Sequence, residues 1–318
     1  MENNNIEKTE KTENTAEVME VTDEPEVIDA PPKKPNKVIQ VLDSCLCAYL
    51  LIIIGQILGA IAIVLPFALI NYENEAVSGA ISAGIAYFVF IGIWITAFVW
   101  FTISKKDSHL KSAMWKGMKG NSIKMLFIGL LLGFAMNSGC ILAAILHKDI
   151  SLSFDSFRPV SFILIFICVF IQSSAEEIIT RGFLYDRLKN TFTSPWPAII
   201  GNALFFSVIH IFNDGITFFA LLNIFIIGLL CSLIVYYFDS IWCVMALHTA
   251  WNFNQNIIFG LPNSGMASSY SVMKLGGEGT VSFAYDPVFG VEGTAVSTVL
   301  LVAACVVIYL IGRKRKAS

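Results

Sequence analysis

SSAEEIITR, residues 173–181, places two adjacent carboxylates and an arginine inside an otherwise apolar segment. A charged side chain at membrane depth costs several kcal/mol, so it normally persists where it performs a function. His210 and His248 likewise fall inside apolar runs. The stretch therefore predicts a membrane-embedded helix whose polar side chains belong to a functional site.

The composition supports a membrane protein. Of the 318 residues, 56% are hydrophobic and 14% are charged, and the mean hydropathy is +0.70, far from the values of a soluble domain. Apolar runs long enough to cross ~30 Å of hydrocarbon recur along the chain. The predicted spans are 45–71, 79–104, 124–147, 159–183, 196–213, 216–238, 241–259 and 295–312. We therefore expect an all-α polytopic membrane protein with about eight transmembrane helices.

Basic residues near the ends of these spans predict the orientation of the chain. With eight crossings, most of them fall on one side, namely Lys33, Lys34, Lys37, Lys105, Lys106, Lys111, Lys116, Lys119, Lys124, Arg187, Lys189 and residues 313–316. Lysine and arginine concentrate on the cytoplasmic side of membrane proteins. Both termini are therefore expected in the cytoplasm.

The chain divides into five regions by composition. Residues 1–38 form an acidic tail with ten of the 24 acidic residues, and its low hydrophobicity predicts a disordered cytoplasmic segment. Residues 39–150 supply the N-terminal transmembrane helices, and 151–260 supply the core that bears the polar motifs. An outer loop over 261–294 then leads to 295–318, the last transmembrane helix with its basic cytoplasmic end.

The two carboxylates of the opening stretch have different neighbours. Glu177 and Arg181 are four residues apart, so they share a helix face in the order that favours an ion pair. Glu176 points elsewhere, because adjacent residues of a helix are rotated by ~100°. It has no local counter-charge, which makes it a candidate general base. The alternative is that both acids are structural partners of Arg181 and other polar groups.

Two further pairs follow at the same spacing. Phe206 and His210 lie on the fifth predicted span, and His248 and Asn252 lie on the seventh. Two donors one turn apart on one face are suited to holding a carbonyl oxygen as it becomes negative. Each pair also has a plain structural interpretation, since polar residues in membranes commonly form hydrogen bonds between helices.

Together the motifs read Glu176-Glu177-x-x-x-Arg181, Phe206-x-x-x-His210 and His248-x-x-x-Asn252. In this order they resemble the three motifs of the CPBP family, which comprises CAAX proteases and bacteriocin-processing (Abi) enzymes and includes the type II CAAX prenyl endopeptidase. The resemblance covers roughly residues 155–260. A later stretch, YDPVFGVEG at 285–293, is similar to a segment that precedes the last helix of bacterial members.

The resemblance implies a CAAX prenyl protease 2-like helical core and an intramembrane peptidase of a bacterial cell membrane. Glu176 with His210 would activate the attacking water, and His248 with Asn252 would stabilise the oxyanion. Glu177, Arg181 and Phe206 would support the site. The implied substrates are membrane-associated peptides, lipopeptides or bacteriocin-type precursors, and a prenylated CAAX substrate is not required.

Two other functions remain open from the sequence. Glu176, His210 and His248 are also a possible ligand set for a catalytic zinc, although the sequence has no HExxH motif. A non-enzymatic membrane scaffold or immunity protein is the third reading. The expected partners are membrane lipid and a peptide or protein substrate, with no nucleic acid and no cofactor other than this zinc.

Overall fold

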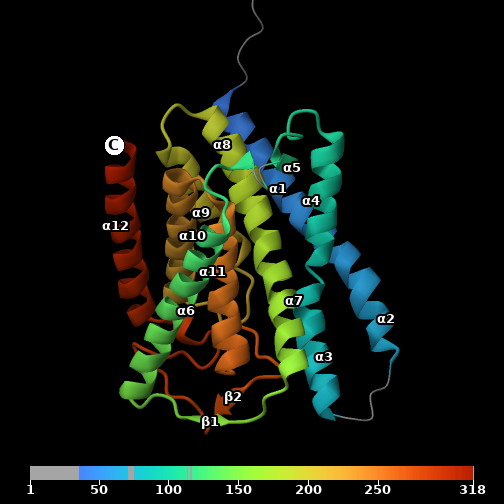
Figure 1. The fold of residues 1–318 in the computed structure, drawn as a ribbon, viewed down its shortest axis with the longest axis vertical. Coiled ribbons are helices and arrows are strands. Elements are labelled where there is room, and N and C mark those ends of the chain that lie inside the picture. Colours follow the sequence, from blue (N-terminus) through green and yellow to red (C-terminus); the bar gives the residue numbers. More distant parts are fainter. Residues whose placement is uncertain (1–35, 71–74, 113, 115–116, 318) are drawn as a thin grey trace, which may run out of the picture. The chain divides into compact units, whose positions relative to one another are not determined.

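The computed structural model describes residues 36–70, 75–112, 114 and 117–317, and most of these residues are helical (Figure 1). The predicted acidic tail lies outside the described residues except for 36–38. Lys37 already begins the first helix, which therefore starts eight residues before the predicted span at 45.

Each of the eight predicted spans is helical in the structure. The first is α1 (Lys37–Gly59), continued by the π-helix η1 (Ala60–Val64) and α2 (Leu65–Ala68). The second is α3 (Glu75–Phe88) with α4 (Ile91–Ile103), and after the short α5 (Leu110–Ser112) the third is α6 (Ile123–Leu146). The fourth is α7 (Pro159–Glu177), which runs through the π-helix η3 (Ile178–Leu184) into α8 (Tyr185–Thr191). The last four are α9 (Trp196–Ile209), α10 (Phe218–Phe238), α11 (Ile241–Phe253) with the π-helix η4 (Asn254–Ile258), and α12 (Ala295–Ala317).

Six helices within the described ranges are long and apolar enough to cross a membrane, against the eight spans that were predicted. Of the other two predicted spans, α9 is a shorter apolar helix of 14 residues, and α11 has 13 residues before η4. The prediction of an all-α polytopic membrane fold is confirmed, and the chain is an integral membrane protein.

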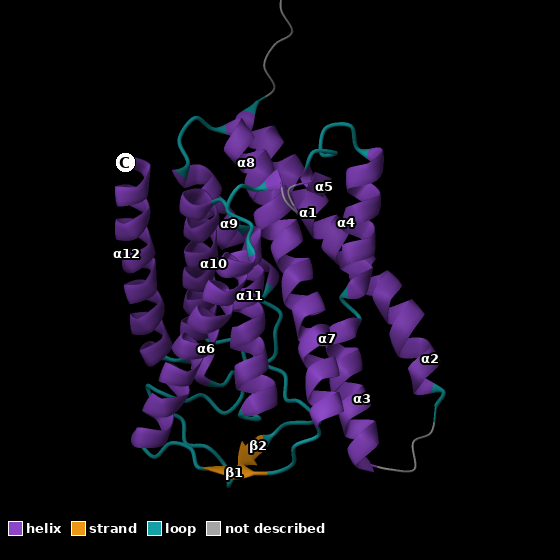
Figure 2. Cartoon of the chain, in the orientation of Figure 1, coloured by secondary structure: helices purple, strands orange, loops and turns teal. Residues whose placement is uncertain are grey.

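The two ends of the bundle differ. Figure 1 shows the start of α1 and the C-terminal end of α12 at one end, which we call the terminal face. At the opposite end, the loop face, the antiparallel strands β1 (Leu152–Phe154) and β2 (Met273–Leu275) pair with Leu152 opposite Leu275 (Figure 2). The sequence did not predict this small sheet. It ties the 261–294 loop to the segment that precedes α7.

A short connection sets α10 and α11 antiparallel to each other. Asp239 ends α10 in the left-handed conformation, with φ of 52°, which aspartate tolerates better than most residues. Ser240 then caps α11, because its side chain accepts a hydrogen bond from the backbone N–H of Cys243. The helix that carries His248 therefore begins at a fixed point.

Glycines bring two pairs of helices into backbone contact. A Cβ atom at Gly129 or Gly133 of α6 would lie 2.1 Å from the carbonyl oxygen of Cys243 or 2.3 Å from that of Leu247, both on α11. Glycines four residues apart let membrane helices approach in this way. A Cβ at Gly59 of α1 would likewise lie 1.9 Å from the carbonyl oxygen of Val89, in the turn before α4, and a Cβ at Gly55 would lie 2.5 Å from Cα of Ile93 on α4. The backbones of α6 and α11 are therefore in close contact, and so are those of α1 and α4.

Candidate active site

Four of the predicted site residues meet in one cavity of about 370 Å³. Glu176 of α7, His210 at the end of α9, and His248 and Asn252 of α11 all line it. The opposite wall comes from α1 and α3, and the loop-face end is closed by residues 263–266. A narrow cavity of about 40 Å³ adjoins it, and His210, His248 and Asn252 line both.

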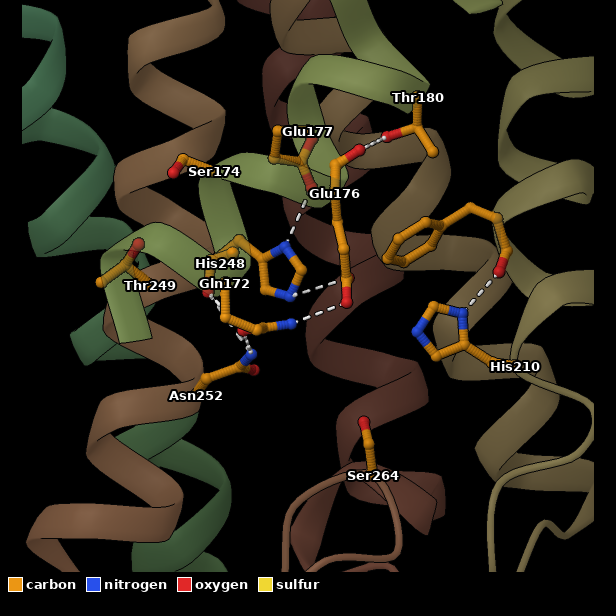
Figure 3. Close-up of polar contacts among 12 residues, drawn as sticks. Gln172, Ser174, Glu176, Glu177, Thr180, His210, His248, Thr249, Asn252 and Ser264 are labelled. Atoms are coloured by element: carbon orange, nitrogen blue, oxygen red, sulfur yellow. Dashed lines mark hydrogen bonds and ion pairs between the residues drawn. The ribbon is translucent and has the colours of Figure 1, made fainter. Parts of the chain in front are cut away.

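Glu176 is buried and only partly satisfied by hydrogen bonds. Its Oε1 atom accepts a 2.7 Å hydrogen bond from Nε2 of Gln172, one turn earlier on α7. Its Oε2 atom has no hydrogen-bond partner and lies 3.9 Å from Nε2 of His248 (Figure 3). A buried carboxylate oxygen without a partner is costly, which is typical of a group that acts on a ligand.

The carboxylate of Glu177 contacts Arg181 and His248 at the same time. Its Oε1 atom is 3.0 Å from Nη1 of Arg181 and 2.9 Å from Nδ1 of His248. Arg181 is buried, and its guanidinium lies 4.2 Å from the centre of the Phe206 ring. The predicted pair of Glu177 and Arg181 therefore forms, and it extends to His248 on another helix.

The His210 side chain lies apart from the other ionisable side chains of the site. Its Nδ1 donates a 2.7 Å hydrogen bond to the carbonyl oxygen of Phe206, and the two rings are 4.6 Å apart at their centres. A ring that donates from Nδ1 keeps a lone pair on Nε2. Figure 3 shows this second nitrogen on the side of the ring that faces Glu176. The two side chains face each other across the cavity without direct contact.

Asn252 lies one turn from His248, as the spacing predicted, but its amide is engaged. Nδ2 donates to Oε1 of Gln172 at 3.1 Å and to Oγ of Ser173 at 3.5 Å. Gln172 therefore bridges Asn252 and Glu176. An oxyanion that binds to Asn252 has to replace or share this hydrogen bond.

Residues 158–254 match the model of one protein family, the type II CAAX prenyl endopeptidase Rce1-like family. This segment is an Rce1-like domain. It contains all three motifs, so the family suspected from them is confirmed. A search of curated proteins gave no match to the chain.

Two residues of the site lie outside the Rce1-like domain and were not predicted. Ser264, at the tip of the loop, lines both cavities, and Glu292, on the 3₁₀ helix η5 (Val291–Gly293), lines the narrow one. Gln172, inside the domain, was also missed. Its position four residues before Glu176 was a usable signal, whereas no local spacing connects Ser264 or Glu292 to the motifs.

Glu292 connects the 261–294 loop to the end of the Rce1-like domain through hydrogen bonds. Its Oε1 atom accepts hydrogen bonds from the backbone N–H of Ser264 at 2.6 Å, Nδ2 of Asn263 at 2.7 Å and Nε2 of Gln255 at 3.3 Å. Gln255 lies on η4, directly after the helix that carries His248 and Asn252. Burial raises the pKa of Glu292 to about 7, although the donors of Ser264 and the proximity of His248 lower it.

This pKa predicts a pH-dependent stability. Between the ordinary pKa of 4.5 and about 7, the folded chain holds a proton on Glu292 that the unfolded chain has lost. The free energy of unfolding therefore falls as pH rises through this window, by about 3 kcal/mol for this group. The glutamine of Glu292→Gln is neutral at every pH. Between pH 5 and pH 8, we therefore expect the melting temperature of this variant in detergent to fall less than that of the wild type.

Glu278→Gln is the matched control, because Glu278 is exposed on the same loop. This variant should keep the wild-type dependence of melting temperature on pH. If melting temperature depends on pH in the same way in Glu292→Gln and in the wild type, Glu292 does not titrate in this window.

The zinc alternative requires a third ligand near Glu176 and His248. Among the residues that the structure describes, no group of three or more histidine, cysteine, aspartate and glutamate side chains is arranged to hold a metal ion. In particular, His248 has a carboxylate near each ring nitrogen, whereas His210 stands across the cavity.

Proposed function

We propose that the chain is an intramembrane endopeptidase in which Glu176 and His210 activate the attacking water. The Rce1-like domain supports a CAAX-type intramembrane protease in general. The observation that carries the finer assignment is the buried Oε2 atom of Glu176, which has no hydrogen-bond partner and belongs to a side chain that lines the cavity together with His210. Water held between an acceptor oxygen and an acceptor nitrogen is oriented for loss of a proton.

The reaction is hydrolysis of a peptide bond. Glu176 takes a proton from water, and the water oxygen forms a bond to the carbonyl carbon. The resulting oxyanion is held by His248 and Asn252. The C–N bond then breaks as the proton passes from Glu176 to the departing nitrogen, which leaves a carboxyl group on one product and an amine on the other.

The surroundings of His248 fit this role. Nδ1 of the ring faces Glu177, so an oxyanion can be bound only through Nε2. The ring then needs a proton on Nδ1 for Glu177 and a proton on Nε2 for the oxyanion. An imidazole with both protons carries a positive charge. The carboxylates of Glu176 and Glu177 stand near its two nitrogens and supply the opposite charge.

We further propose a location and a substrate class. Membrane-associated peptides, lipopeptides or bacteriocin-type precursors are the substrates, and the surrounding lipid is the other partner. The chain would reside in a bacterial cell membrane with both termini in the cytoplasm. The start of α1 and the end of α12 share the terminal face, and α12 ends with basic residues in its last turn.

The orientation predicts which cysteines can be labelled from outside. In a background without the native cysteines, Glu278→Cys on the loop face should react with an impermeant thiol reagent in intact cells. Lys314→Cys on the terminal face should react only after the membrane is made permeable. The reverse pattern would contradict the cytoplasmic placement of the termini.

The experiment that tests the proposed activity is hydrolysis by the purified protein in ¹⁸O-labelled water. A library of membrane-associated peptides is incubated in liposomes, and mass spectrometry reads the products. We expect cleavage with one ¹⁸O atom in the new carboxyl group. No cleavage of any peptide by folded protein would contradict the peptidase assignment.

Chelation distinguishes this mechanism from the zinc alternative. We expect activity to survive exhaustive chelation, because Glu176, His210, His248 and Asn252 each have a role that needs no metal. Elemental analysis should find well below one zinc per chain. Activity that disappears with the chelator and returns with stoichiometric zinc would replace the proposed mechanism by that of a metallopeptidase.

A further inference from the structure

A separate cavity of about 210 Å³ lies at the terminal face, where Figure 1 shows α5, α8 and the end of α12. We call it the terminal cavity, and its lining includes Tyr185, Lys189 and Lys316. No described residue lines both this cavity and the active-site cavity. The buried hydroxyl of Tyr185 has no hydrogen-bond partner among the described residues. Because an unpaired buried hydroxyl is costly, the terminal cavity is suited to a ligand that accepts hydrogen bonds.

Two lysine side chains of the terminal cavity are available to an anion. Lys189 is exposed and forms no ion pair with a described carboxylate, and Nζ of Lys316 lies over the ring of Tyr236. The other charged groups of the wall already have partners, namely Asp186, Asp239, Arg181 and His109. The terminal cavity therefore favours an anionic group with several acceptor oxygens, and a phosphate has both properties.

A second cavity, of about 380 Å³, has an apolar lining, and we call it the apolar cavity. Trp94, Ser174 and Trp242 line it, but their polar atoms are engaged. Nε1 of Trp94 donates to Oγ of Ser174 at 3.1 Å, and Nε1 of Trp242 donates to the carbonyl oxygen of Met114 at 2.9 Å. The hydroxyl of Ser174 donates to the carbonyl oxygen of Phe170. The apolar cavity is therefore suited to a hydrocarbon chain.

The two cavities follow one another along the same helices. Ser174 lines the apolar cavity, and Ile178, one turn later, lines the terminal cavity. On α11, Ile241 lines the terminal cavity and Trp242 lines the apolar one, while Met114 lines both. Because α7 runs from the loop face toward the terminal face (Figure 1), the apolar cavity lies deeper in the membrane. Together the cavities match a molecule with an anionic head and an apolar tail.

The apolar cavity borders lipid and is separate from the active site. Ile91, Leu126 and Phe170 line it and are partly exposed on membrane-spanning helices, so a chain can enter from the bilayer. Ser174 and Glu176 are two residues apart and are therefore rotated by ~200° about α7. The apolar cavity and the active-site cavity thus lie on different sides of this helix.

We propose that the terminal and apolar cavities together bind one anionic phospholipid. Its phosphate contacts Lys189 and Lys316, and one acyl chain lies between α4, α6, α7 and α11. The basic residues of the terminal face attract anionic lipid to this end of the bundle. The site is distinct from the active site, and its occupation does not depend on the proposed peptidase function.

Native mass spectrometry of the full chain in detergent tests the head of this site. Phosphatidylglycerol and phosphatidylcholine with identical acyl chains are compared. Wild type should bind one phosphatidylglycerol about 25-fold more tightly, since each lysine near an anionic headgroup contributes about fivefold. Lys189→Gln with Lys316→Gln should remove this preference. Equal binding of the two lipids by wild type, or an unchanged preference in this variant, would overturn the proposal.

The control is Lys105→Gln with Lys106→Gln, because these lysines are also exposed after α4 but line neither cavity. It removes the same charge and should keep the preference. A loss of preference in the control equal to that in the Lys189 and Lys316 variant would show attraction by the whole face, and no site. Glycerol phosphate, which has no acyl chain, should not displace the lipid at equal concentration. Displacement would show that the site takes a free phosphate.

Brominated acyl chains test the position of the tail. With one brominated phosphatidylglycerol per chain, the bromines should quench the fluorescence of Trp94 and Trp242. Trp94→Phe with Trp242→Phe should lose most of this quenching, whereas Trp196→Phe should keep it, because Trp196 lines neither cavity. Unchanged quenching in the Trp94 and Trp242 variant would place the acyl chain elsewhere and overturn the proposal.

Discussion

Glu176→Gln should lower kcat by about 10²- to 10⁴-fold, because the amide cannot take a proton from water. The exchange keeps the size of the side chain, and the amide oxygen can still accept the hydrogen bond from Gln172. Folded yield and melting temperature should therefore remain close to wild type. The measurement is turnover of a cleaved peptide by protein of matched purity in liposomes.

The control for this variant is Gln172→Glu, which alters the same hydrogen bond but leaves the Glu176 carboxylate in place. It should impair activity less than Glu176→Gln and should shift the pH profile, because it adds a second carboxylate beside the first. Near-normal turnover by Glu176→Gln would remove Glu176 from the role of base.

Arg181→Met should have the largest effect on folding. The side chains of Arg181 and Glu177 are 0% and 1% exposed, so the substitution removes the guanidinium of a buried pair and leaves the Glu177 carboxylate with His248 alone. Breaking such a pair costs about 3–5 kcal/mol, and Phe206 also loses its contact with the guanidinium. We expect a lower yield of folded protein and a lower melting temperature in detergent.

The double variant Glu177→Gln with Arg181→Met tests the cause of this loss. It removes both charges of the buried pair, so much of the folded yield should return. Activity should not return, because His248 then lacks the carboxylate at Nδ1. If the double variant is as unstable as Arg181→Met alone, loss of packing rather than loss of charge pairing explains the defect.

Much of the fold was predictable because membrane spans have a strong local signal. Continuous apolar runs located eight helical segments, of which six are long and apolar enough to cross a membrane, and α6 begins at Ile123 against a predicted 124. The larger error, at the start of α1, has a physical reason. Asp43 interrupts the apolar run, yet its carboxylate pairs with Arg187 of α8 at 3.1 Å. A tertiary contact thus allows the helix to extend through a polar region.

Within the site, spacing predicted what lies on one helix and missed what crosses between helices. The four-residue spacing correctly paired Glu177 with Arg181. It gave no sign that the next residues form the π-helix η3, or that Gln172 bridges Glu176 and Asn252. Ser264 and Glu292 reach the site through a loop, and only the three-dimensional path of the chain shows their proximity.

The glycine contacts described above have a mechanical consequence. α11, which carries His248 and Asn252, cannot rotate or slide against α6 without steric overlap at Gly129 and Gly133. α1, which lines the opposite wall, is tied to α4 in the same manner at Gly59. Each pair therefore keeps a fixed internal geometry. His248 and Asn252 hold their distance from α6, and the α1 wall of the cavity holds its distance from α4, so any adjustment of the cavity has to come from the other elements that line it.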